Sequence, residues 1–175
     1  SELALPGSDL AHGQIPESNA LLLSNLARMA GAEVVLEITV RDDNDELRRA
    51  LAEGSALGAD AVITSGGVSA GAFEVVRNTL GAMVFSSVAM QPGKPQGFAG
   101  GRPLLFGLPG NPVSAAVSFE VFVRPALLTM QGRTAVSRHT LRMPVTTGWS
   151  VPGAIPVPVR RRRERFDRAP VPRAR

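Results

Sequence analysis

The sequence predicts an α/β fold, a three-layer α/β/α domain with a mainly parallel sheet, and three observations favour it. Short apolar runs rich in β-branched residues alternate along residues 1–133 with stretches of helical period. Several of these runs end in turns rich in Gly, Pro, Asp or Asn, after which a helix begins. The 175 residues, 44% of them hydrophobic, suffice for one such core and leave little for a second. We therefore expect ligands to bind beyond the C-terminal ends of the strands.

The predicted elements follow from periodicity and from capping signals. Residues 2–5 have the composition of the end of a strand whose beginning is missing. Helices are expected over about residues 20–30, 45–57, 72–80 and 112–130. Strands are expected over about residues 32–40, 61–63, 83–90 and 104–106. Pro95 restricts any strand within 91–101 to a short piece or a sheet edge, and Pro125 predicts a kink or break in the last helix.

The stretch Ala61 to Gly71, AVITSGGVSAG, predicts a buried strand that runs into a glycine-rich turn and then a helix. Adjacent glycines leave room for a ligand's oxygen atoms, and main-chain N–H groups with a helix N-terminus supply a positive field. The turn therefore has the features of an anion site, although an ordinary tight turn explains the same residues. Its spacing matches neither a dinucleotide-binding fingerprint nor a P-loop.

The C-terminal part differs in composition from residues 1–133. Residues 134–150 have the alternating pattern that begins a β-rich domain, and residues 151–175 form a Pro/Arg-rich tail without helical or strand period. The tail carries eight arginines against Glu164 and Asp167, so the basic charge of the chain lies there. With only Phe166 interleaved, this composition favours a disordered tail over a nucleic-acid site.

The sequence contains no cysteine, which excludes a disulfide framework, a thiolate metal site and a cysteine nucleophile. Its N-terminus lacks the pattern of a signal peptide, and no apolar run approaches the roughly 20 residues of a membrane span. We expect a cytoplasmic protein without a membrane partner.

Five motifs occur in an order that is characteristic of one family: GQIPESN, VRDDNDELRRAL, ITSGGVSAG followed by Glu74, AMQPGKPQG and LPGNPVS. On these motifs the chain resembles the molybdopterin molybdenumtransferase family, in the central molybdopterin-binding domain that also occurs in the C-terminal region of gephyrin. The resemblance implies the molybdopterin adenylyltransferase-like fold over residues 1–133, lacking its first strand and truncated at both ends. The GGVS turn followed by PGKP and LPGNP favours this family over the related single-domain adenylyltransferases.

The resemblance implies insertion of molybdate into adenylylated molybdopterin, with release of AMP and with Mg²⁺ as cofactor. It implies catalytic roles for Glu2, Asp42 and Glu74, the last two as metal ligands, because Mg²⁺ prefers carboxylate oxygens. The substrate-binding residues that it implies lie in the three glycine-bearing turns: Ser65, Gly66, Gly67, Ser69, Gly71, Pro92, Gly93, Lys94, Pro109, Gly110, Asn111 and Ser114.

Several of these residues have a structural alternative. Asp42 precedes a helix, so N-capping would account for it, and Glu74 lies in a first helical turn, where a carboxylate is favourable in any case. Lys94 is the only lysine of the sequence and either reaches a phosphate or lies solvated in a loop.

The sequence also departs from the family pattern. Lysines are common in the family where this chain has Ser87 and Gln91, so an anionic substrate loses cationic partners there. The alternatives are therefore a truncated, non-catalytic pterin-binding or scaffold module of the same fold, or a molybdopterin adenylyltransferase. For the full-length family, the resemblance implies a homodimer and a molybdopterin adenylyltransferase as partner.

Overall fold

The computed structural model describes residues 3–4, 9, 12–13, 15–40, 43–66 and 83–140. Its helices are α1 (Asn19–Met29), α2 (Asn44–Ala56), α4 (Pro112–Ser118), the π-helix η1 (Phe119–Val123) and α5 (Arg124–Met130). Its strands are β1 (Leu3–Ala4), β2 (Ile15–Pro16), β3 (Ala61–Ser65), β4 (Val84–Ser87), β5 (Pro95–Ala99) and β6 (Leu104–Leu108). The helices predicted over 20–30, 45–57 and 112–130 are thus confirmed. The first two begin and end one residue earlier than predicted, and the third has the predicted bounds.

The main sheet of the described chain has the strand order β3-β6-β5-β4, and β1 pairs with β2 in a separate two-stranded sheet. Strand β6 runs parallel to β3 and antiparallel to β5, which in turn runs antiparallel to β4. The α/β class is confirmed, but the described four-stranded sheet is mixed, whereas the sequence predicted a mainly parallel one. The reason is that β4 and β5 form a hairpin, a local connection that brings antiparallel strands together.

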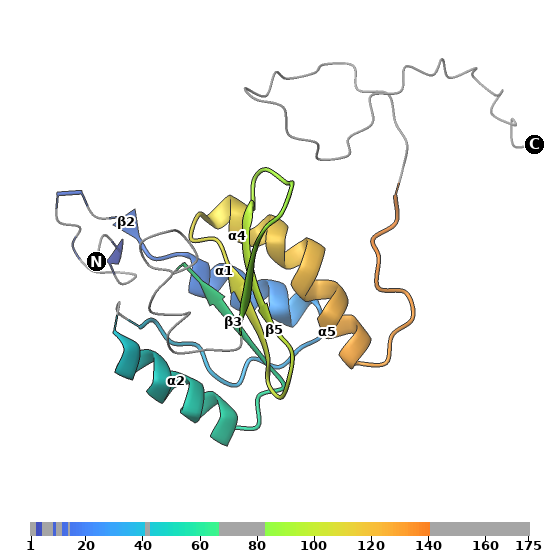
Figure 1. The fold of residues 1–175 in the computed structure, drawn as a ribbon, viewed down its shortest axis with the longest axis horizontal. Helices are drawn as coiled ribbons and strands as arrows, with labels where there is room; N and C mark the ends of the chain where they lie inside the picture. Colours follow the sequence, from blue (N-terminus) through green and yellow to red (C-terminus); the bar gives the residue numbers. More distant parts are fainter. Residues whose placement is uncertain are drawn as a thin grey trace, which may run out of the picture.

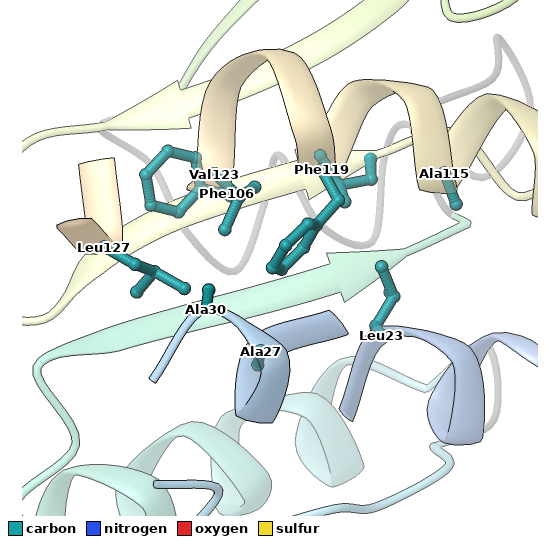
Figure 2. Close-up of a cluster of buried hydrophobic side chains, with 9 residues drawn as sticks. Leu23, Ala27, Ala30, Phe106, Ala115, Phe119, Val123 and Leu127 are labelled. Atoms are coloured by element: carbon teal, nitrogen blue, oxygen red, sulfur yellow. The ribbon is translucent and has the colours of Figure 1, made fainter. Parts of the chain in front are cut away.

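Helices cover both faces of this sheet, as expected for three layers (Figure 1). On one face α1 and the helix of residues 112–130 pack over β3 and β6. Figure 2 shows Leu23 and Ala27 of α1, and Ala30 directly after this helix, facing Phe119 and Leu127 of the long helix. On the other face Leu47 and Leu51 of α2 belong to a second cluster of apolar side chains, whose remaining members are Val40, Met83, Phe85, Ala99 and Leu105. Successive residues of β6 therefore enter different layers, which is the side-chain alternation of a strand.

Residues 112–130 form one continuous helix whose middle is a π-helical turn. The N–H of Arg124 donates to the carbonyl oxygen of Phe119, five residues back. Pro125 lacks an N–H, so the regular ladder cannot continue through it, and the widened turn adjusts the helix immediately before the proline. The break predicted at Pro125 takes this form.

This 19-residue helix contains an 18-residue window with a mean hydropathy of 1.4, so it is long and apolar enough by composition to cross a membrane. The sequence-based expectation that no apolar run approaches such a length needs this correction. However, Phe119 and Val123 are among the least exposed side chains of the described core, at 1% and 0%. We therefore interpret it as the central helix of the domain.

The expected strand over residues 32–40 is wrong, and the expectation of a short strand or an edge strand within 91–101 holds only as a short strand. Residues 32–40 form no strand, although Ala32, Val34 and Leu36 turn inward in alternation with exposed neighbours. This segment and β3 line the same cavity of about 740 Å³, so the segment lies beside β3 without joining the ladder. Strand β5 lies inside the sheet and not at an edge. Pro95 is tolerated because it is the first residue of β5, and the pairing with β6 begins only at Gly97.

Other expectations lie outside the described residues. They are the helix over 72–80, most of the β-rich segment 134–150, and the tail 151–175.

Candidate functional site

The strand register places three turns at one edge of the sheet. Ser65 at the end of β3 pairs with Leu108 at the end of β6. Strand β5 is antiparallel to β6, with Gly97 opposite Gly107, so β5 begins where β6 ends. Because Ser87 pairs with Pro95, the β4–β5 turn emerges at this same edge. The register thus brings the described parts of the SGG, PGKP and LPGNP turns to one edge of the sheet.

Two of the turns are in contact. The N–H of Gly66 donates to the carbonyl oxygen of Leu108 at 3.1 Å, which continues the β3–β6 pairing into the turn. A Cβ added to Gly110 would lie 3.4 Å from Cα of Gly66, so the two glycine backbones approach closely. Gly66 has a φ of +81°, a conformation that glycine adopts without steric cost. Since its N–H donates to Leu108, Gly66 has a structural role in the turn.

Asn111 begins the long helix as the sequence predicts. Its side chain accepts from the N–H of Ser114 at 3.1 Å, and Pro112 occupies the first helical position. Asn111 and Gly110 are exposed, whereas Pro109 is buried. The capping role of Asn111 is therefore structural, and its exposure leaves it accessible to a ligand at the helix N-terminus.

The PGKP turn rests on the helix of residues 112–130. Gly93 is buried, has a φ of +101°, and a Cβ added to it would lie 2.9 Å from Oγ of Ser118. The Gln96 amide nitrogen donates to the carbonyl oxygen of Gly93 at 2.7 Å and to Oγ of Ser118 at 2.6 Å. The side chain of Lys94 is exposed, while its carbonyl oxygen accepts from the N–H of Val88 at 2.7 Å.

The start of α1 is bound to the LPGNP turn. The Asn19 amide nitrogen donates to the carbonyl oxygen of Gly110 at 2.7 Å, 91 residues away in the chain. Asn19 is 8% exposed, and its Oδ1 is buried without a hydrogen-bond partner. Ser18 makes no side-chain capping bond; instead the Glu17 carboxylate accepts from the N–H groups of Asn19 and Ala20, at 2.7 and 3.0 Å.

Sequence reasoning missed four polar residues that organise this edge: Glu17, Asn19, Gln96 and Ser118. Glu17 and Asn19 lie within the GQIPESN motif, which was the available signal. Gln96 lies within the AMQPGKPQG motif, but its contact with Ser118 gave no signal, because the two residues are 22 positions apart in the sequence.

The cavity beside β3 reaches this edge at one of its ends, where Glu17, Asn19, Ser65, Gly66 and Gly110 line it. Its other end lies at the C-terminal ends of α1 and α5. Only the first end meets the predicted turns, so only that part belongs to the candidate site.

The acidic residues predicted for the site, Glu2, Asp42 and Glu74, lie outside the described residues, as do Gly67, Ser69 and Gly71. Asp43, which is described, caps α2: its carboxylate accepts from Asp45 N at 2.7 Å and from Glu46 N at 3.0 Å. These two main-chain hydrogen bonds hold the pKa of Asp43 below its ordinary value of 3.8, and the bond from Glu46 has the larger effect. Among the described residues, no group of three or more His, Cys, Asp or Glu side chains is placed to hold a metal ion.

The geometry thus defines a class of protein, an α/β domain with three neighbouring turns at one edge of its main sheet. A family profile described as "Probable molybdopterin binding domain" matches residues 4–129. The chain belongs to this family of molybdopterin-binding domains.

Curated relatives carry the same assignment. The chain is 50% identical over 143 residues to molybdopterin molybdenumtransferase 2 of Mycobacterium tuberculosis, a match that covers 75% of this chain and 35% of the relative. It is 38% identical over 139 residues to the molybdopterin molybdenumtransferase of Nostoc, covering 75% of this chain and 32% of that protein. The chain therefore spans about a third of the length of these relatives.

Solved structures show the same fold. A crystal structure of the molybdopterin biosynthesis MoeA protein from Pyrococcus horikoshii superposes with a TM-score of 0.61 at 31% identity, covering 75% of this chain and 33% of that one. A second crystal structure, of a molybdopterin biosynthesis MoeA protein from Pyrococcus horikoshii OT3, gives a TM-score of 0.59 at 26% identity, covering 78% of this chain and 32% of that one. Both the family and the fold implied by the sequence resemblance are confirmed.

Proposed function

We propose that this chain is the pterin-binding domain of an enzyme that inserts molybdate into adenylylated molybdopterin and releases AMP. Membership in the molybdopterin-binding family and the names of its relatives support the reaction. The structural observation that carries the proposal is the contact between the turns after β3 and β6, where a Cβ added to Gly110 would lie only 3.4 Å from Cα of Gly66. Such closely packed glycines leave a surface of main chain to which phosphate oxygens have access.

The described turn residues have roles in binding. Exposed Gly110 and Asn111 present the N-terminus of a 19-residue helix, whose dipole favours an anion. The Ser65 hydroxyl lies at the end of β3 and lines the cavity that Gly110 also lines. We assign to Lys94 the role of a positive charge that contacts the phosphates, since its side chain is exposed beside Gly93.

We propose Glu2, Asp42 and Glu74 as catalytic residues and Asp42 and Glu74 as ligands of Mg²⁺. The proposal rests on the family match and on their places in the motifs: Asp42 directly precedes the cap of α2, and Glu74 follows the turn after β3. Bound Mg²⁺ would neutralise charge on the phosphates as AMP leaves. Asp43 is not proposed as a ligand, because its carboxylate is engaged by two main-chain N–H groups of α2.

The test is release of AMP from adenylylated molybdopterin in the presence of molybdate and Mg²⁺. Asp42→Asn should abolish release, while Asp43→Asn, which preserves the helix cap, should retain most of it. The proposal is wrong if the chain joined to the parts that its relatives possess releases no AMP. It is also wrong in its assignment of Asp42 if the two asparagine variants behave alike.

A second candidate is a pterin-binding module that does not catalyse insertion. Ser87 and Gln91 favour it, because they replace positive charge near the PGKP turn. Calorimetry distinguishes the two: the module binds adenylylated molybdopterin with no AMP formed. For the complete protein we also propose cytoplasmic location, a homodimer, and a molybdopterin adenylyltransferase as the partner that supplies the substrate.

A further inference from the structure

The side chain of Gln96 joins the PGKP turn to the long helix. Its amide nitrogen has two hydrogens, and the two hydrogen bonds at 2.7 Å to Gly93 O and 2.6 Å to Ser118 Oγ use both. The amide orientation is fixed, because a carbonyl oxygen such as that of Gly93 only accepts. Ser118 is fully buried at 0% exposure, so its hydroxyl has no water to replace Gln96.

Gly93 is held against the helix by the same contact. Its φ of +101° and the 2.9 Å that would separate an added Cβ from Ser118 Oγ both require glycine. The turn therefore cannot tilt toward the helix without a clash, and it cannot move away without breaking the bond from Gln96. The backbone of Lys94, the next residue, is therefore held in a fixed position.

The helix sets the distance between two turns of the candidate site. Asn111 caps the helix, and Ser118 lies seven residues further along the chain. At a rise of about 1.5 Å per residue, the Gly93 contact lies about 10 Å from the cap. Gln96 and Ser118 thus fix Lys94 relative to the Gly110–Asn111 turn.

We propose that Gln96 and Ser118 are positioning residues that place the Lys94 ammonium for the phosphates of the substrate. This inference rests on the proposed function of the PGKP turn. Lys94 supplies the charge, and the Gln96–Ser118 bond restricts where that charge lies. Loss of the bond should weaken substrate binding because Lys94 is no longer held in place, and not only because the domain is less stable.

The experiment compares Gln96→Met with Gln131→Met in the full chain. Methionine keeps the length of the side chain and removes the donors. Gln131 is a matched control, because its amide also bonds a distant carbonyl oxygen, that of Ala30, at 3.0 Å. That bond lies at the opposite end of the domain, since the long helix runs back from the edge where β6 ends.

We expect Gln96→Met to weaken the affinity for adenylylated molybdopterin about tenfold, and Gln131→Met to change it by less than about twofold. Lys94→Met should also weaken it, and adding Gln96→Met to Lys94→Met should cause little further loss, since both act through one charge. Ser118→Ala, a smaller change, repeats the comparison if Gln96→Met does not fold.

A second readout uses the single lysine. Reductive methylation with ¹³C labels only Lys94 and the N-terminal amine, and the Lys94 signal reports its surroundings in the free protein. We expect Gln96→Met to change the position or width of this signal, because the turn that carries Lys94 is no longer held against the helix, and Gln131→Met to leave it unchanged. Equal effects of the two variants, or additive losses with Lys94→Met, would overturn the inference while the proposed function stands. No binding by the unaltered chain would overturn both.

Discussion

Substitution of Asn19 by leucine separates a role in folding from a role in the site. Asn19 makes one side-chain hydrogen bond, to Gly110 O at 2.7 Å, and leaves its buried Oδ1 unpaired. The lost bond costs about 1 kcal/mol, but removing an unpaired buried acceptor returns about 1–3 kcal/mol. Gly110 is exposed, so water can take the place of the amide at its carbonyl oxygen. The difference between the two contributions is about 0–2 kcal/mol in favour of the variant, so we expect the free energy of unfolding to rise by no more than about 2 kcal/mol.

Function should respond differently. Without the bond, the LPGNP turn is no longer attached to α1, and we expect AMP release from adenylylated molybdopterin to fall about tenfold, because small displacements of binding groups have large effects on rate. Urea unfolding and the AMP assay measure the two quantities, with exposed Asn25→Leu in the same helix as the control. A loss of more than about 3 kcal/mol would mean that Asn19 is mainly a structural anchor. Unchanged AMP release would show that the turn does not need this attachment.

Two further predictions concern the fold. Phe119→Ala should lower the free energy of unfolding by about 3–5 kcal/mol, because Phe119 is only 1% exposed. Phe98→Ala is the control and should cost far less, because Phe98 is 48% exposed. Equal losses of stability in urea unfolding would contradict the assigned core. The lowered pKa of Asp43 means that its carboxylate stabilises the folded chain above its ordinary pKa of 3.8, and that this stabilisation is lost as the pH falls through the folded-state pKa. The advantage of the unaltered chain over Asp43→Ala should therefore be present at about pH 7 and shrink at about pH 3, and a pH-independent difference would refute the charge-based part of the cap.

Local signals in the sequence predicted the parts of the fold that depend on neighbouring residues. Asn111 and Pro112 gave the start of the long helix to the residue, because capping involves only the next three residues. Pro125 gave the place of a break but not its form. Whether a helix bends or widens at a proline depends on what packs around it, and here Phe119 and Val123 are both held in the core.

Features that depend on distant partners could not be predicted in this way. Residues 32–40 have the composition of a strand and its alternating burial, yet a strand also needs a partner for its main chain. The position of β5 inside the sheet likewise depends on its pairing with β6. The presence of Pro95 in the sequence gives no information about that pairing. The contact between Gln96 and Ser118 could not be predicted either, although Gln96 lies in the AMQPGKPQG motif, because the two residues are 22 positions apart.

The candidate site also combines features that depend on neighbouring residues with features that depend on distant ones, and sequence motifs identify only the first kind. Glycines and caps mark where the main chain bends, and these positions can be recognised in the sequence. The side chains that fix one bend relative to another, Asn19 to Gly110 and Gln96 to Ser118, act across 91 and 22 residues and are amides or hydroxyls that are common on any surface. Each of the two attachments joins a turn at the sheet edge to a helix, so the spacing of the turns is set by α1 and by the helix of residues 112–130. If the turns bind one extended substrate, breaking either attachment should reduce affinity even though no residue that touches the substrate has changed.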